Sequence, residues 1–90
     1  MEPENSRHVR LFGEYGIDRR DELRKILESI DLGPVSLDLS GVTYADSIFL
    51  GQLVALRRRL QEVTLTGANA TLRKIFTLCG FDQLFHIVDE

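Results

Sequence analysis

The stretch that decides the fold is Val35-Ser-Leu-Asp-Leu-Ser-Gly-Val-Thr-Tyr-Ala-Asp-Ser-Ile-Phe-Leu-Gly51. Its first five residues alternate apolar and polar side chains, which predicts a strand that the Ser40-Gly41 pair ends. Asp46 and Ser47 offer N-cap chemistry for a helix expected over about 47–59. The inward face of that helix consists of apolar residues at helical spacing: Phe49, Leu53, Leu56 and Leu60. The segment therefore predicts a strand, a short connection over 42–45, and a helix that packs against a sheet.

Strands and helices also alternate on both sides of this segment. Upstream, 8–13 is expected to be a short strand, and Asp18 is a plausible N-cap for a helix that Gly33 and Pro34 end. The remaining expected elements follow in chain order: a strand over 62–66, a helix over 70–78 closed by Gly80, a short helical or turn segment over 81–84, and a possible final strand over 85–88. This order predicts one α/β domain with a sheet of about four strands, mixed or mostly parallel, and three to four helices mainly on one face. Residues 1–6 are expected to form a disordered polar tail, and 7–90 the domain.

Length and composition limit the classes of function. The 90 residues suffice for one domain, and a net charge of −3, from 14 acidic and 11 basic residues, argues against a nucleic-acid binder. The single cysteine, Cys79, lies in an apolar run and is expected to be a small buried residue. Residues 1–10 do not resemble a signal peptide, and no apolar run approaches the roughly 18 residues that span a membrane. These features predict a cytoplasmic protein without direct membrane insertion.

The sequence offers no assembled catalytic or metal-binding set. Asp38 and Asp46 are expected near one edge of the sheet, but no base or nucleophile accompanies them. His8 and His86 lack the spacing of metal ligands. No glycine pattern typical of a phosphate-binding loop is present. We therefore expect no enzyme activity, no catalytic residue, no metal and no cofactor.

The segment 35–51 resembles the signature of the STAS family, the domain shared by anti-sigma-factor antagonists and sulfate transporters. That family has a strand ending in Asp-Leu-Ser, a short loop, and Asp-Ser-Ser/Thr-Gly-Leu-Gly opening a helix; Asp38-Leu39-Ser40 and Asp46-Ser47-x-x-Leu50-Gly51 match it. Thr66-Gly-Ala-Asn69 and Cys79-Gly-Phe-Asp-Gln-Leu-Phe85 resemble its closing segment. The resemblance extends from about residue 8 to residue 88. It departs at Ile48 and Phe49, which replace the second hydroxyl residue and the glycine.

The resemblance implies a binding switch. In antagonist members, the serine aligned with Ser47 is phosphorylated by an anti-sigma-factor kinase, the unphosphorylated form binds that partner, and a phosphatase resets it. Other members bind partners without phosphorylation or serve as subunits of larger assemblies such as lipid transporters. From the residues alone, Asp46 and Ser47 need only cap a helix. The basic run Arg57-Arg-Arg59 has two interpretations, a solvated helix face or part of a partner-contact surface.

The candidate site gathers around Ser47, the predicted phosphorylation site. The predicted partner-binding residues are Asp38, Ser40, Tyr44, Asp46, Ser47, Ile48, Phe49 and Gly51. If Ile48 or Phe49 is exposed, it forms an apolar patch beside the serine that a partner would cover. The alternative is that both side chains pack inward. The expected partner is a protein, and no nucleic acid is expected.

Overall fold

Four parallel strands form one sheet in the order β1-β2-β3-β4, with helices connecting them. The structure is a computed structural model that describes residues 7–30, 34–60 and 62–88. In chain order the elements are β1 (Arg7–Tyr15), the 3-10 helix η1 (Ile17–Arg19), α1 (Arg20–Glu28), β2 (Val35–Ala45), α2 (Ser47–Arg59), β3 (Val63–Thr66), α3 (Ala70–Leu78), α4 (Phe81–Leu84) and β4 (His86–Val88). The predicted single α/β domain is thereby confirmed, with a sheet that is parallel throughout. The predicted tail over residues 1–6 lies outside the described residues.

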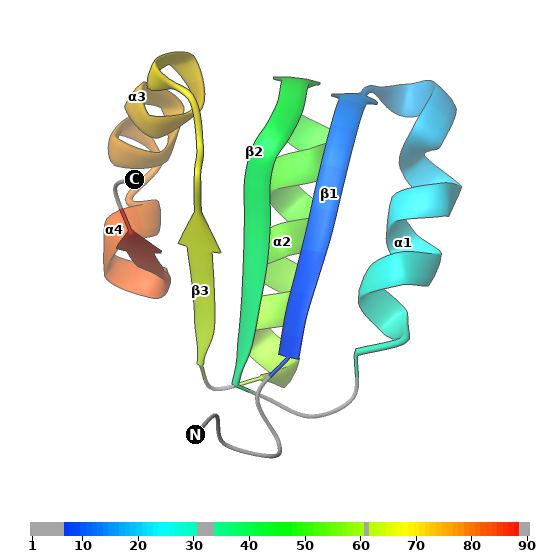
Figure 1. Cartoon of the computed structure of the whole chain (residues 1–90), viewed down its shortest axis with the longest axis horizontal. Coiled ribbons are helices and arrows are strands. Elements are labelled where there is room, and N and C mark those ends of the chain that lie inside the picture. Colours follow the sequence, from blue (N-terminus) through cyan, green and yellow to red (C-terminus); the bar gives the residue numbers. More distant parts are fainter. Residues whose placement is uncertain (1–6, 31–33, 61, 89–90) are drawn as a thin grey trace.

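The helices pack mainly on one face of the sheet. Figure 1 shows α2 behind β1 and β2, with α1 on one side and α3 and α4 on the other. Alternate strand residues such as Leu37 and Leu65 are fully buried under these helices, because successive side chains of a strand point to opposite faces. The intervening residues, such as Ser36 and Thr64, are only half-buried on the open face. The predicted inward face of α2 is confirmed, since Phe49, Leu53, Leu56 and Leu60 all belong to the core.

Strand β2 continues to Ala45, so the predicted break at Ser40-Gly41 and the predicted connection over 42–45 are wrong. The pairing of β1 with β2 shifts register twice, and β2 carries the extra residue each time. At the first shift, buried residues of β2 fall at Leu39 and Val42, three apart instead of two. A β-bulge has this effect, because one extra residue bends the strand and interrupts the alternation without ending the pairing. The sequence pattern therefore resembled a strand end.

The first helix does not begin at Asp18. That residue lies in η1, and neither the N-cap of η1 nor that of α1 is closed by a side-chain hydrogen bond. Helix α1 ends at Glu28, where Ser29 Oγ donates a hydrogen bond to Ile26 O at 2.6 Å. The predicted stop signal at Gly33 lies outside the described residues.

Helices α3 and α4 close the domain around an aromatic cluster. Asn69 caps α3 by accepting the Leu72 N–H at 2.8 Å, and Gly80 makes the predicted turn in the left-handed region, at φ 76°. Phe81 then stacks on Phe76, with ring centroids 5.3 Å apart. Cys79 is exposed, so the prediction that it is buried is wrong. Cys79 is the C-cap of α3, and the buried side chains at this end of the helix are Phe76 and Phe81.

Candidate protein-binding surface at the start of helix α2

Ser47 is the first residue of α2 and is exposed. The residue before it, Asp46, is the N-cap: its Oδ1 accepts the backbone N–H groups of Ile48 at 3.0 Å and Phe49 at 3.1 Å. This arrangement satisfies two of the donors that the first turn of a helix leaves free. The cap therefore fixes the position of the serine, and its hydroxyl-bearing side chain lies on the surface.

The two departures from the family pattern differ in burial. Phe49 is 1% exposed and stacks on Tyr15 of β1, with ring centroids 5.4 Å apart. It therefore belongs to the core, and its inclusion among the partner-contacting residues is wrong. Ile48 is half-buried and lines a groove between α1 and α2. Phe49 packs the start of α2 against the sheet, so it does not contribute to the surface beside Ser47.

Small residues run along the outer face of α2. Ser47, Gly51 and Ala55 are spaced four residues apart, which places them on one face, and all three are exposed. A Cβ at Gly51 would meet no atom within 4 Å. A glycine inside a helix costs roughly 0.5–1 kcal/mol relative to alanine. No contact within the described chain requires this glycine, so the fold carries a cost there that a close-approaching partner would explain.

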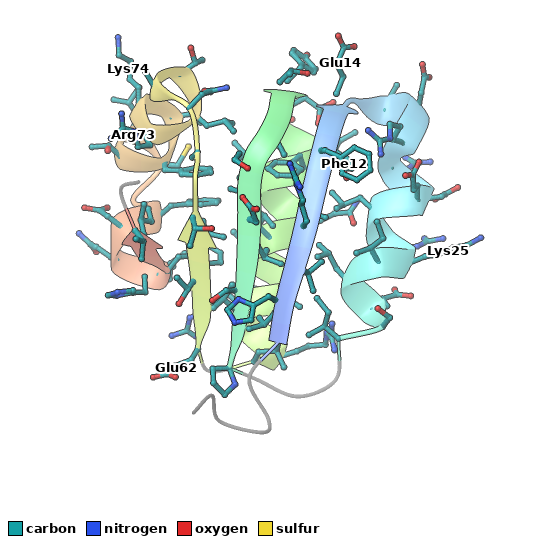
Figure 2. All side chains as sticks on the ribbon, viewed as in Figure 1. Phe12, Glu14, Lys25, Glu62, Arg73 and Lys74 are labelled. Carbon is teal, nitrogen blue, oxygen red and sulfur yellow. The ribbon has the colours of Figure 1, made fainter. Side chains whose placement is uncertain are left out.

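Exposed apolar side chains gather near the same end of the sheet. Phe12, Ile17 and Tyr44 are 60%, 63% and 53% exposed, and they come from β1, η1 and the end of β2. Figure 2 shows Phe12 on β1 and Glu14 at the carboxyl end of the strands. Glu14 pairs in register with Tyr44, whose ring also lies close to Gly16. Sequence reasoning included Tyr44 but missed Phe12 and Ile17, because their exposure follows from the packing of β1 and η1 and not from a local motif.

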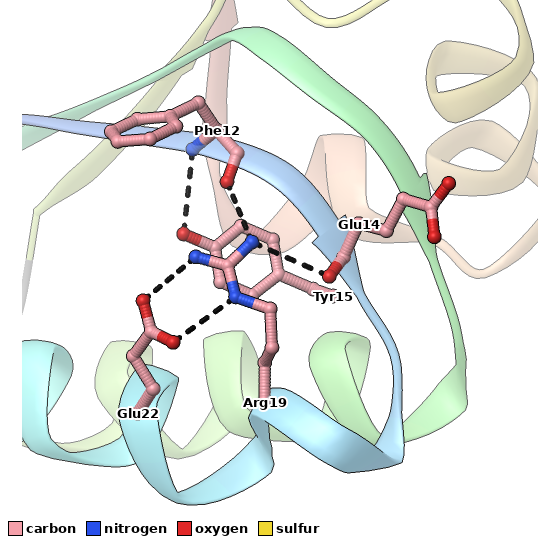
Figure 3. Close-up of polar contacts among 5 residues, drawn as sticks. All are labelled: Phe12, Glu14, Tyr15, Arg19 and Glu22. Atoms are coloured by element: carbon pink, nitrogen blue, oxygen red, sulfur yellow. Dashed lines mark hydrogen bonds and ion pairs between the residues drawn. The ribbon is translucent and has the colours of Figure 1, made fainter.

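Arg19 holds this corner of the molecule together (Figure 3). Its guanidinium donates to Phe12 O at 2.9 Å and Glu14 O at 3.4 Å, pairs with both oxygens of Glu22, and lies 4.2 Å from the ring centroid of Tyr15. The hydrogen bond with Arg19 lowers the pKa of Glu22, and the same bond raises the pKa of Arg19. Five contacts on one planar cation make the end of β1 and the start of α1 a fixed border of the surface.

Asp38 and Ser40 lie elsewhere. They lie at the bulge on the open face of the sheet. β2 continues for seven residues beyond Asp38, which corresponds to about 20 Å of extended chain. The expectation that Asp38 and Asp46 lie near one edge of the sheet is therefore wrong. Its Oδ1 accepts the Ser40 N–H at 3.0 Å, and this hydrogen bond is the main reason that the pKa of Asp38 is lowered. Both residues have a structural role in the bulge, and they line a separate hollow with Thr66, Gly67 and Val88.

The three arginines near the end of α2 have different roles. Arg57 donates to Leu84 O at 2.7 Å, and Arg59 donates to Leu27 O at 2.8 Å and Ile30 O at 3.1 Å. These two side chains tie α2 to the ends of α4 and α1. Arg58 is exposed. Neither predicted interpretation of the run covers Arg57 and Arg59, whose carbonyl partners only the packing of the helices could reveal.

Over 7–30, 34–60 and 62–88, no group of three or more His, Cys, Asp or Glu side chains could hold a metal ion. Within the same ranges, every helix falls short of the length and apolar character that a membrane crossing requires.

The chain folds as a small α/β domain with a parallel four-stranded sheet and helices mainly on one face. An exposed serine, Ser47, begins the helix that follows β2. Residues 2–89 match the family model described as Mlab, STAS domain, so the chain belongs to the STAS domain family. A STAS-domain containing protein of Pseudomonas aeruginosa (strain UCBPP-PA14) is 28% identical over 85 residues, which cover 88% of this chain and 84% of that protein. The fold is also that of the SulP transporter STAS domain from Vibrio cholerae, with a TM-score of 0.65 at 17% identity, covering 96% of this chain and 76% of that one.

Proposed function

We propose that this protein is a non-enzymatic regulatory module that binds a protein partner through the surface around Ser47. The observation that carries the proposal is the outer face of α2, where the exposed Ser47 is followed by an exposed Gly51 that no contact within the described chain requires. Exposed Tyr44 and Ile17 lie toward the same end of the domain and supply apolar area that a partner would cover. STAS domains mediate protein–protein interactions, which agrees with such a role.

We further propose that phosphorylation of Ser47 reverses the binding, as the resemblance to anti-sigma-factor antagonists implies. A phosphate adds roughly −1.5 to −2 charge at pH 7. Asp46 already occupies the N–H groups of Ile48 and Phe49, so a phosphate on Ser47 would lie beside a carboxylate and find those donors taken. Its charge would project toward the partner and oppose docking. In this proposal the partner is an anti-sigma factor or serine kinase, a phosphatase resets the switch, and the protein acts in the cytoplasm.

A second candidate function is that of an accessory subunit in a larger assembly, such as a lipid transporter, that is never phosphorylated. The observation that favours it is the fold match with a STAS domain that belongs to a transporter. In that case the same surface would hold a permanent partner. The position of Ser47 would then matter only for packing.

Quantitative capture of partners from a cell extract tests the proposed function. The wild-type chain is compared with Ser47→Ala, Ser47→Glu and the matched control Thr71→Glu, which places a carboxylate on an exposed residue in the first turn of α3. We expect Ser47→Glu to lose the partner that the other three capture. Equal capture by all four, with folds intact, would place the binding surface elsewhere. Incubation with extract and ATP, followed by mass spectrometry of Ser47, then separates the two candidates, because only the switch acquires phosphate.

A further inference from the structure

A groove of about 470 Å³ runs between α1 and α2, beside the candidate surface. Its floor is apolar, with Leu27 and Leu56 of the core beneath and Ala55 exposed along one side. Ile48, the residue after Ser47, also lines this groove. The groove therefore adjoins the start of α2, where Ser47 lies. The low outer ridge of α2, formed by Gly51 and Ala55, leaves the groove accessible from outside.

Hydrogen bonds between the two helices preform the groove. Near its start, Gln52 Nε2 donates to Arg20 O at 3.1 Å. At its other end, Arg59 donates to Leu27 O at 2.8 Å and Ile30 O at 3.1 Å. Gln52 and Arg59 are seven residues apart on α2, which corresponds to about 10 Å of helix. The groove is thus about two helical turns long, and hydrogen bonds near both of its ends tie the two helices together.

The groove is positively charged although the net charge of the whole chain is −3. Three guanidinium groups line it, from Arg20, Arg24 and Arg59, against the single carboxylate of Glu28. Asp21 approaches two of the arginines, Nε of Arg20 at 3.9 Å and Nη2 of Arg24 at 3.4 Å. Even with Asp21 included, the arginines outnumber the carboxylates, so the local field favours acidic groups on whatever enters.

We propose that this groove binds an amphipathic helix of the protein partner, with apolar side chains on one face and Asp or Glu beside them. The inference rests on the proposed function, and it names the chemistry of the partner. A channel between two packed helices suits a third helix, whose side chains every three or four residues fill the apolar floor. The arginines at the rim then pair with the acidic residues. A second copy of this chain is a poor occupant, because a symmetric contact would bring the same positive rim against itself.

The test is an NMR titration of the full chain with a synthetic helix of about four turns, which carries Leu at i, i+3 and i+7 and mainly Glu and Ala elsewhere. A second peptide replaces each Glu by Lys. The variants are Arg24→Glu and its matched control Lys25→Glu, the next residue of α1, which points away from the sheet in Figure 2 and does not line the groove. Melting temperatures verify that both variants fold.

We expect the acidic peptide to shift backbone amides of residues that line the groove, and the Lys peptide not to bind. Arg24→Glu should weaken binding at least ~10-fold and Lys25→Glu less than ~2-fold, because only the former reverses a charge at the rim. Equal binding of the two peptides, shifts mapping elsewhere, equal loss in both variants, or self-association through this face would overturn the inference. The titration does not depend on Ser47. It can fail while Ser47→Glu still abolishes partner capture, and it can succeed when Ser47→Glu changes nothing.

Discussion

Asp46 Oδ1 accepts the backbone N–H of Phe49 at 3.1 Å, and this contact sets the start of the helix that carries Ser47. Replacing an N-cap residue by alanine costs about 0.5–2 kcal/mol. We expect Asp46→Ala to lower the free energy of unfolding by about 1 kcal/mol in chemical denaturation. The control is Asp18→Ala, since Asp18 makes no cap hydrogen bond; it should change stability by less than ~0.5 kcal/mol. Equal losses in the two variants would contradict the assigned role of Asp46.

Two glycines should respond to alanine in opposite directions. Gly51 lies in α2 with open space around it, so Gly51→Ala should stabilise the fold by about 0.5–1 kcal/mol. Gly13 has φ 93°, and a Cβ there would lie 2.5 Å from Arg19 Nη1, so Gly13→Ala should destabilise it by more than about 1 kcal/mol. Thermal unfolding of both variants measures this. If Gly51→Ala is more stable yet binds the partner less tightly, the glycine is needed for close approach of the partner. Unchanged binding would contradict this role of Gly51.

Adjacent arginines on α2 should differ in their contribution to stability. Both side chains are exposed, but only Arg59 donates hydrogen bonds to two carbonyls at the end of α1. Arg59→Met should lower the free energy of unfolding by about 1–2 kcal/mol, because a charged donor to backbone oxygens is lost. Arg58→Met should have an effect within about 0.5 kcal/mol. A measured order that is reversed would mean that α1 and α2 are held together by other contacts.

The hydrogen bond from Ser40 to Asp38 predicts a dependence on acid pH. Because the pKa of Asp38 is lowered in the folded state, its charged form adds stability at pH values above the unfolded pKa of about 3.9. That contribution is lost as the pH falls through the lower, folded value. Denaturation at several pH values should show a wild-type advantage over Asp38→Asn of only a few tenths of a kcal/mol near neutrality, since the carboxylate is largely exposed to solvent. The advantage should shrink toward zero in strong acid, and curves that stay parallel would exclude this linkage.

Local patterns were sufficient where backbone preference and burial agree. The span predicted for α2 matches Ser47–Arg59, because Asp46 caps it and its apolar residues face one side. The end of α3 at Gly80 was likewise predicted from a single residue, and the structure places this glycine in the left-handed region. The prediction was wrong at Asp18 and Cys79. A capping residue type is only a preference until the chain direction is set, and an apolar run does not by itself show which of its residues reaches the core.

The candidate site shows the same division. The sequence by itself determined an exposed Ser47 behind a capping aspartate, since both follow from adjacent residues. Helical spacing already placed Phe49 on the inward face of α2, but only the tertiary structure decided that its ring stacks on Tyr15 and that Asp38 belongs to a bulge on the open face. The charged groove likewise exists only where α1 lies against α2. The physical reason is that capping and periodicity act within a few residues, whereas bulges, stacking and grooves depend on strand register and helix packing between segments distant in the chain.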